Sequence, residues 1–303
     1  MNSQEFKKVA MVMGGFSAER EVSLVTGEMC SLALKDEGFE VIEIDAGFDL
    51  ANKLLETKPD VIFNALHGRW GEDGCAQGIF EWLQIPYTHS GIHASAQSMD
   101  KLKAKEVFKA NELPTPRSIK IPKNEVLKHL PFNPPFVVKP VRDGSSVGVE
   151  IIHTEIPSSL LGKAFEVDYM IEDYIPGREL TVSVLDKKSL TVTEIITKGF
   201  YDYSAKYTEN GSFHEVPANI PDAVFEACLE YSEIAHHALG CEGLTRTDFR
   251  WDDTKGLEGL MLLETNTQPG MTQTSLSPEQ ASQFGMDLGK LCRKLIELAS
   301  CNK

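Results

Sequence analysis

The chain has 303 residues, 42% of them hydrophobic and 25% charged, which is typical of a globular protein large enough for two or three packed modules around a common cleft. The formal net charge of −15 disfavours nucleic acid and acidic membrane surfaces as partners and leaves small molecules as the expected ligands. No apolar run reaches the roughly 20 residues that span a bilayer, and residues 1–8 lack the apolar core of a signal peptide, so we expect a cytoplasmic protein without a membrane partner.

The first hundred residues alternate short apolar runs with helical periodicity. Apolar runs predict strands at residues 9–13, 41–44, 61–64 and 85–88. Between the first two runs, apolar residues recur at helical spacing over residues 22–32. This β–α–β order predicts a parallel sheet with helices on its faces.

The middle of the chain changes from β–α–β units to hairpins. A helix is predicted from Ser98, a favourable N-cap, to about residue 113, where Pro114 and Pro116 stop it. Beyond the prolines, strands are predicted at residues 136–139, 148–153, 169–172, 180–185 and 190–197.

The last third combines a long helix over residues 221–239, strands near 245–251 and 260–264, and one final helix from about Pro278. We therefore expect three modules: an α/β module over residues 1–97 and two α+β modules over residues 98–176 and 177–303.

Two strand ends in the last module carry oxygen-bearing side chains. The segments T-R-T-D-F-R and L-L-E-T-N place Asp248, Glu264 and Asn266 on neighbouring strands. Mg²⁺ prefers such ligands and is often held by one or two carboxylates, with substrate phosphates completing its shell. On this segment alone, two solvated acids and a turn asparagine remain an equal alternative.

The segment K-P-V-R-D-G-S-S-V-G-V, residues 139–149, suits a phosphate-covering loop. Gly144 and Gly148 let the backbone approach closely, Ser145 and Ser146 offer hydroxyl and N–H groups, and Lys139 supplies a positive charge. It is not a Walker loop, because no Gly-Lys-Ser/Thr opens a helix here. An ordinary hairpin turn fits the segment equally well.

Three further motifs follow predicted strands. In G-G-F-S-A-E-R-E, residues 14–21, a helix N-terminus suits an anion and Glu19 suits an ammonium group, although Glu19 also fits simple helix-dipole stabilisation. In A-L-H-G-R-W-G-E-D-G, residues 65–74, His67 and Glu72 are site candidates, although a lone histidine is usually structural. Residues 201–207, Y-D-Y-S-A-K-Y, fit a lid over a site or an aromatic-rich surface hairpin.

Together and in this order, the motifs resemble the D-alanine–D-alanine ligases of the ATP-grasp superfamily over nearly the whole chain. The motifs that carry the resemblance are G-G-x-S-x-E-x-E, L-H-G-x-x-G-E-D-G, S-M-D-K, G-S-S-x-G, Y-D-Y-x-A-K-Y and E-x-N-T-x-P-G-M-T. The resemblance implies an ATP-grasp fold, in which a parallel-sheet domain precedes two α+β lobes that enclose ATP. It also implies ATP-dependent joining of two D-alanines through a D-alanyl phosphate for peptidoglycan synthesis, Mg²⁺ or Mn²⁺ as the metal, and a homodimer.

The resemblance also implies roles for individual residues. It places ATP against Lys101, Lys139, Gly144, Ser146, Gly148, Glu172, Asp173, Tyr174, Ile175, Glu179 and Lys206. It assigns the metal to Asp248, Glu264 and Asn266, and the two amino-acid sites to His67, Ser275 and Leu276. Glu19 would bind the first D-alanine's ammonium and connect through Ser145 to Tyr207, while Arg246 and the Gly270 N–H would stabilise an oxyanion.

Two alternatives to a dipeptide-forming enzyme stay open at this point. One is a ligase that joins D-alanine to D-lactate or to another amino acid, and the other is a nucleotide-binding regulatory protein without turnover. Tyr207 favours the dipeptide, because dipeptide-forming relatives carry tyrosine at that place in the motif. The base that deprotonates the second D-alanine is not assigned.

Overall fold

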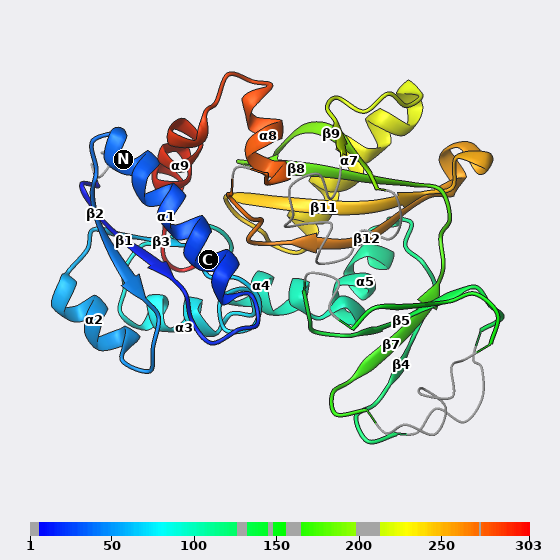
Figure 1. Cartoon of the computed structure of the whole chain (residues 1–303), viewed down its shortest axis with the longest axis horizontal. Helices are drawn as coiled ribbons and strands as arrows, with labels where there is room; N and C mark the ends of the chain where they lie inside the picture. The colour runs from blue at the N-terminus through cyan, green and yellow to red at the C-terminus, as the bar shows by residue number, and fades with distance from the viewer. Residues whose placement is uncertain (1–5, 126–131, 145–147, 156–164, 198–212, 273) are drawn as a thin grey trace.

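The structure, a computed structural model, describes residues 6–125, 132–144, 148–155, 165–197, 213–272 and 274–303. Within these ranges the strands form three sheets (Figure 1). The first sheet has the order β2-β1-β3 and consists of β1 (Lys8–Met13), β2 (Glu40–Asp45) and β3 (Val61–Asn64). All of its pairs are parallel, and Val9 is in register with Val41 and Val61, which confirms the predicted β–α–β order.

Helices cover both faces of this sheet. Val9 and Met11 pack toward α1 (Arg20–Asp36) and α9 (Leu288–Glu297), whereas Ala10 and Val12 pack toward α2 (Leu50–Thr57) and α3 (Cys75–Trp82). Successive strand residues point to opposite faces, so a sheet covered on both sides needs a continuous apolar run. Figure 1 shows α9, from the end of the chain, lying beside α1.

The fourth predicted strand, at residues 85–88, is wrong as a full strand. Tyr87 forms single bridges with Ile62 and Ser300, and the neighbouring Pro86 has no N–H to extend a ladder. Pairing with β3 is therefore limited to the hydrogen bonds on either side of Ile62, from the Ile62 N–H to the Pro86 carbonyl (2.8 Å) and from the Thr88 N–H to the Ile62 carbonyl (3.0 Å). On its other side, Tyr87 exchanges two hydrogen bonds with Ser300.

The helix predicted from Ser98 is present as α5 (Lys101–Ala110), with a later start. A separate helix that was not predicted, α4 (Ile92–Met99), lies directly before it. Ser98 lies inside α4, and the N-cap of α5 is Asp100, whose carboxylate accepts a hydrogen bond from the Lys103 N–H at 3.1 Å. An extended residue with a short acceptor side chain is a favourable cap, so Asp100 rather than Ser98 starts the second helix.

The second sheet is antiparallel and has the order β4-β7-β5-β6. Its strands are β4 (Ser118–Ile121), β5 (Phe136–Pro140), β6 (Glu150–Ile152) and β7 (Tyr169–Asp173). Phe136, Val138 and Ile171 form its apolar core.

The third sheet is also antiparallel and has the order β10-β9-β8-β11-β12. Its strands are β8 (Arg178–Leu185), β9 (Lys188–Ile196), β10 (Phe213–Glu215), β11 (Leu244–Trp251) and β12 (Leu260–Asn266). The helix α7 (Asp222–Ala238) covers one face, and the short 3-10 segment η1 (Asp253–Gly259) joins β11 to β12.

The prediction of one final helix from Pro278 is wrong, because this segment forms two helices. The chain forms α8 (Leu276–Ser282), turns through Gly285 at φ 72°, and continues as α9. Because α9 shares a core with β1 and β3, the end of the chain stabilises the first sheet. The predicted boundaries after residues 97 and 176 stay predictions.

Candidate active site

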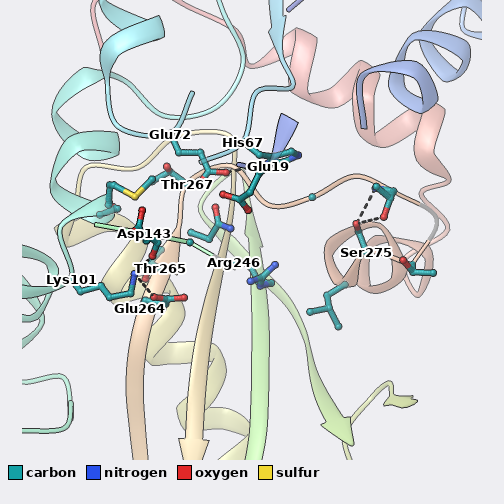
Figure 2. Close-up of a pocket in the computed structure, with 18 residues that line it drawn as sticks. Glu19, His67, Glu72, Lys101, Asp143, Arg246, Glu264, Thr265, Thr267 and Ser275 are labelled. Carbon is teal, nitrogen blue, oxygen red and sulfur yellow. Dashed lines mark hydrogen bonds and ion pairs between the residues drawn. The ribbon is translucent and has the colours of Figure 1, made fainter. Parts of the chain in front are cut away.

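A cavity of about 100 Å³ collects residues from all three parts of the chain (Figure 2). Its walls come from the loops after β1 and β3, from α4 and α5, from the loop after β5, and from β11, β12 and the start of α8. The residues predicted from the sequence that line it are Glu19, His67, Glu72, Lys101, Gly144, Arg246, Glu264, Asn266, Gly270, Ser275 and Leu276. Residues far apart in the chain are therefore brought to one place.

Two neighbouring strands form the floor of the cavity through Arg246, Glu264 and Asn266, whereas Asp248 lies beside them and does not line the cavity. In the register of β11 and β12, Asp248 lies opposite Glu264 and Arg246 lies opposite Asn266. Residues two apart share one face of a strand, so these four side chains project from the same side of the sheet. The hydroxyl of Thr181, on the adjacent β8, donates to Asp248 Oδ1 at 2.6 Å.

The acidic side chains of this floor are paired with cations. Arg246 binds Asp248 through two hydrogen bonds, Nε to Oδ1 at 2.9 Å and a second guanidinium nitrogen to Oδ2 at 2.8 Å. Lys101 Nζ lies 3.2 Å from Glu264 Oε2 and donates to the Asp143 carbonyl at 2.7 Å. In the view of Figure 2 the pair of Lys101 and Glu264 lies to one side of Arg246.

This group of oxygen atoms fits a hard divalent cation. Two carboxylates and the amide oxygen of Asn266 are the ligand types that Mg²⁺ and Mn²⁺ favour. Asn266 Oδ1 accepts a hydrogen bond from the Gln268 N–H at 2.8 Å, which fixes the direction of the amide. The donor set is thus suitable in chemistry, with Arg246 and Lys101 balancing the carboxylate charge.

The upper wall holds an acid and a histidine. Glu19 is the N-cap residue of α1 and lies directly before its first turn. Ser17 Oγ donates to the His67 carbonyl at 2.7 Å and accepts from the Glu19 N–H at 3.2 Å, so it joins the two loops. His67 is buried, with Nδ1 3.1 Å from Glu72 Oε1 and Nε2 3.0 Å from Thr26 Oγ1.

Two glycines make room for the Glu19 carboxylate. A Cβ at Gly68 would lie 2.5 Å from Glu19 Oε2, and one at Gly144 would lie 3.1 Å from the same atom. Gly68 also has φ +68°, which disfavours other residue types. The acid therefore reaches across the cavity to the loop after β5.

The remaining wall is the turn before α8. Ser275 Oγ accepts a hydrogen bond from the Thr272 N–H at 2.9 Å and lies 2.8 Å from Thr272 Oγ1. A Cβ at Gly270 would lie 3.0 Å from Ser275 Oγ, so this residue also packs closely against the turn. Leu276 is buried and starts α8.

The residues predicted to contact adenine and ribose lie outside this cavity, at the end of β7 and the start of β8. Asp173 forms an ion pair with Arg117 at 3.0 Å, and Tyr174 contacts the ring of His153. Arg250 donates to the Ile175 carbonyl at 3.2 Å and lies 3.4 Å from Glu179 Oε2, so it holds both ends of this segment.

Glu172 is buried at the end of β7 between two lysines. Lys139 Nζ contacts Oε1, and Lys105 Nζ lies 3.1 Å from Oε2. Burial alone would raise the pKa of Glu172, but the charges of Lys139 and Lys105 outweigh it and the pKa is lowered. Lys105 was not among the predicted residues, although its spacing of four from Lys101 on a helix with buried Ala104 and Phe108 was a signal for it.

Four predicted residues, Ser145, Ser146, Lys206 and Tyr207, lie outside the described residues. Gly148, at the end of the same loop, has φ +71° and packs against Pro140 and Tyr169. Among the described helices, none combines the length and apolar character needed to cross a membrane.

Known proteins agree with this architecture. A family model described as D-ala D-ala ligase C-terminus matches residues 108–297, and one described as D-ala D-ala ligase N-terminus matches residues 45–90. The D-alanine–D-alanine ligase of Ruegeria pomeroyi is 55% identical over 305 residues, and that of Cereibacter sphaeroides is 55% identical over 303 residues. Each alignment covers 100% of this chain and 99% of the relative.

A solved structure gives the same answer. The D-alanine–D-alanine ligase from Bacillus anthracis complexed with ATP superposes with a TM-score of 0.81 at 32% identity, covering 97% of both chains. The fold and the site together define an ATP-dependent ligase of the ATP-grasp type. Within that class, the chain belongs to the D-alanine–D-alanine ligase family, which confirms the resemblance found in the sequence.

Proposed function

We propose that this chain joins two D-alanine molecules with ATP, through a D-alanyl phosphate, and releases ADP and phosphate. The product, D-alanyl-D-alanine, is a precursor for peptidoglycan. The observation that carries the proposal is the cavity, which gathers an acid for an ammonium group (Glu19), cations for phosphate and oxyanion (Lys101, Arg246) and oxygen ligands for a metal (Glu264, Asn266), with Asp248 opposite Glu264 on β11.

ATP would lie between the second and third sheets. Lys101, Gly144 and Ser146 would contact its phosphates together with Lys139, Gly148 and Lys206, and the segment Glu172, Asp173, Tyr174, Ile175 and Glu179 would contact adenine and ribose. Asp248, Glu264 and Asn266 would hold Mg²⁺, for which Mn²⁺ can substitute. The bound metal supplies positive charge to the phosphates during transfer.

The first step activates a carboxylate, because a free carboxylate would have to expel oxide or hydroxide. Glu19 would bind the ammonium of the first D-alanine and orient its carboxylate toward ATP. A carboxylate oxygen attacks the γ-phosphorus, the bond to the bridging oxygen breaks, and ADP leaves. Lys101 lies beside Glu264 and would offset the charge that develops on the transferred group.

The second step forms the amide bond. The neutral amine of the second D-alanine attacks the acyl carbon to form the C–N bond. The nitrogen loses one proton, and the C–O bond to phosphate breaks as phosphate departs from the tetrahedral intermediate. Arg246 and the Gly270 N–H would donate hydrogen bonds to its oxyanion. The amino-acid sites would be bounded by His67, Ser275 and Leu276, with Ser145 connecting Glu19 to Tyr207.

The choice of second substrate is the sharpest test. Purified protein is incubated with ATP, Mg²⁺ and D-alanine, with and without D-lactate, and the products are identified by mass spectrometry. We expect D-alanyl-D-alanine and ADP in both mixtures, with L-alanine as the inactive control. Predominant D-alanyl-D-lactate would replace the proposal by a depsipeptide ligase, and ATP binding without ADP formation would replace it by a regulatory nucleotide-binding protein.

We further propose a cytoplasmic homodimer that associates through the N-terminal module. Phe48 and Trp82 are 99% and 89% exposed, and exposed aromatic side chains of this size favour a protein interface. Light scattering after size exclusion measures the mass. A Trp82→Glu variant with the same mass as the parent would contradict an interface at this position.

We also propose that the modules end near residues 97 and 176. Limited proteolysis followed by mass spectrometry tests this, because exposed linkers are cleaved first.

A further inference from the structure

A buried lysine outside the cavity contacts the site proposed for ATP. Lys105 lies on α5 with a side chain only 2% exposed. Its ammonium donates to Thr115 Oγ1 at 2.7 Å and to the Pro116 carbonyl at 3.2 Å, and it lies 3.1 Å from Glu172 Oε2. Three different segments therefore meet at this one cation: α5, the linker of residues 114–116 that follows it, and β7.

The cluster of Lys105, Lys139 and Glu172 carries more positive than negative charge. Lys105 and Lys139 both face the single carboxylate of Glu172, whose side chain is 4% exposed. Burial lowers the pKa of Lys105 to about 8, partly opposed by Glu172, so Lys105 is still mostly charged at pH 7. Within the described residues, the ion pairs of this cluster comprise two cations and one anion.

The two lysines are not equivalent. The ammonium of Lys105 is fixed by Thr115 and Pro116, whereas the described contact of Lys139 is with Glu172. Glu172 Oε2 accepts no hydrogen bond of normal geometry within the described structure, so Lys105 acts on it mainly through charge. Lys139 is thus the lysine that can exchange its partner.

We propose that Lys105 is a positioning residue for ATP, which keeps Glu172 ionised and in place when Lys139 turns from Glu172 to a nucleotide phosphate. This inference rests on the proposed function, in which Lys139 and Glu172 contact ATP. A buried carboxylate without a cation is strongly unfavourable. Without Lys105, each binding event would have to remove Lys139 from Glu172, and no other described cation is paired with that carboxylate.

A purely structural role is the competing explanation. Lys105 joins α5 to the linker at Thr115 and Pro116, and its loss would then lower stability without changing the affinity of the folded protein for ATP. The positioning role instead predicts a selective loss of affinity for ATP. Turnover at saturating ATP and the KM for D-alanine should change little, because Lys105 does not line the cavity.

The experiment compares Lys105→Met with Lys103→Met, whose side chain is 61% exposed on the same helix and paired with Glu106. Calorimetry measures the Kd of ATP with Mg²⁺ in the absence of D-alanine, and steady-state assays give kcat and both KM values. For Lys105→Met we expect the Kd and KM of ATP to rise by about tenfold or more, with kcat within about threefold. Lys103→Met should match the wild type in every value.

A double-mutant cycle identifies the group through which Lys105 acts. In a Glu172→Gln background, Lys105→Met should cause no further loss of ATP affinity, because the carboxylate charge is gone. An equal loss in both backgrounds would overturn the proposal, and so would an unchanged ATP Kd in folded Lys105→Met.

A milder variant covers the case in which Lys105→Met does not fold. Thr115→Val keeps the charge but removes the hydroxyl that fixes the ammonium, and should raise the KM of ATP by about twofold to threefold with kcat preserved. An unchanged KM in that variant would overturn the proposal. If the wild type forms no D-alanyl-D-alanine, the proposed function fails instead, so the two failures are distinguishable.

Discussion

A single glutamine connects the first sheet to the strand that carries the metal-site residues. Gln268 is 2% exposed; its Nε2 donates to the carbonyls of Asn64 (2.8 Å) and Leu66 (2.6 Å), and its Oε1 accepts from Asn64 Nδ2 (2.8 Å). Gln268→Leu keeps a similar volume and removes all three hydrogen bonds. At about 1 kcal/mol for each buried bond, we expect a loss of about 3 kcal/mol in the free energy of unfolding.

Activity should fall with stability in this variant. His67 directly follows Leu66, whose carbonyl accepts a hydrogen bond from Gln268, and Asn266 lies two residues before Gln268. Loss of the Gln268 hydrogen bonds therefore misplaces both walls of the cavity. We expect the melting temperature to fall by about 5 °C for a chain of this length, and kcat/KM for D-alanine to fall roughly tenfold through loss of positioning. Thermal denaturation and the product assay measure the two effects.

The matched control is Gln283→Leu at the exposed end of α8, which should change the free energy of unfolding by less than about 0.5 kcal/mol. If Gln268→Leu has the same melting temperature and kcat/KM as Gln283→Leu, the three hydrogen bonds of Gln268 contribute neither to stability nor to positioning.

Three further predictions concern the metal site, the oxyanion and pH. Glu264→Gln removes a proposed metal ligand and should lower kcat by at least about 100-fold, with the melting temperature preserved. Arg246→Lys removes the forked guanidinium and should lower kcat by roughly 100-fold to 1,000-fold, measured as ADP release. Burial lowers the pKa of His236 to about 4 from the 6.5 of an unfolded histidine. Its contribution to stability is therefore complete above pH 6.5 and is lost as the pH falls from 6.5 toward 4, by about 1 kcal/mol per pH unit. His236→Leu should make the pH dependence of the unfolding free energy, measured by urea titration, shallower by that amount.

Each of these predictions has a control or a contradicting result. Glu258→Gln, on the exposed surface of η1, should retain full turnover, and near-normal activity of Glu264→Gln would remove the metal assignment. For Arg246→Lys, an unchanged kcat with a raised KM would show uniform substrate binding instead of oxyanion stabilisation. His237→Leu, exposed next to His236 on α7, should leave the pH dependence unaltered, and an equal change in both histidine variants would contradict the assignment.

The strands could be predicted where burial dictates their composition. β1 and β3 are covered on both faces, so their residues are continuously apolar and read clearly from the sequence. The helix boundaries were less certain, because Ser98 and Asp100 are both good caps and the choice depends on how α4 packs. The turn at Gly285 that separates α8 from α9 was missed for a similar reason, since α9 is held by its contact with α1.

The lining of the cavity could be predicted in part, but the pairings of its residues could not. Arg246 and Glu264 were expected at the site and line the cavity, whereas Asp248, expected as a metal ligand, lies next to it on β11, and the roles of all three stay predictions. Their partners depend on the register between strands and on contacts across the chain, which no local pattern contains. Lys105 and Gln268 were missed because each acts from a buried position through residues distant in sequence.

The ion pairs at the site also explain how a chain with a net charge of −15 can bind a polyphosphate. Three of its basic residues are held at carboxylates: Arg246 at Asp248, Lys101 at Glu264 and Lys139 at Glu172. These contacts keep positive charge at the site against the field of the whole chain. A divalent cation at Asp248 and Glu264 would replace Arg246 and Lys101 as their counter-charge, so both become available to substrate when the metal enters. Lys105 serves Glu172 in the same way when Lys139 leaves it. If this exchange operates, ATP with Mg²⁺ should bind before D-alanine. Calorimetry should then show at least about tenfold weaker D-alanine binding in the absence of nucleotide and Mg²⁺ than in the presence of Mg²⁺ and a non-hydrolysable ATP analogue, which prevents turnover. Equal D-alanine affinity in both conditions would show that Arg246 is already available and that the exchange does not occur.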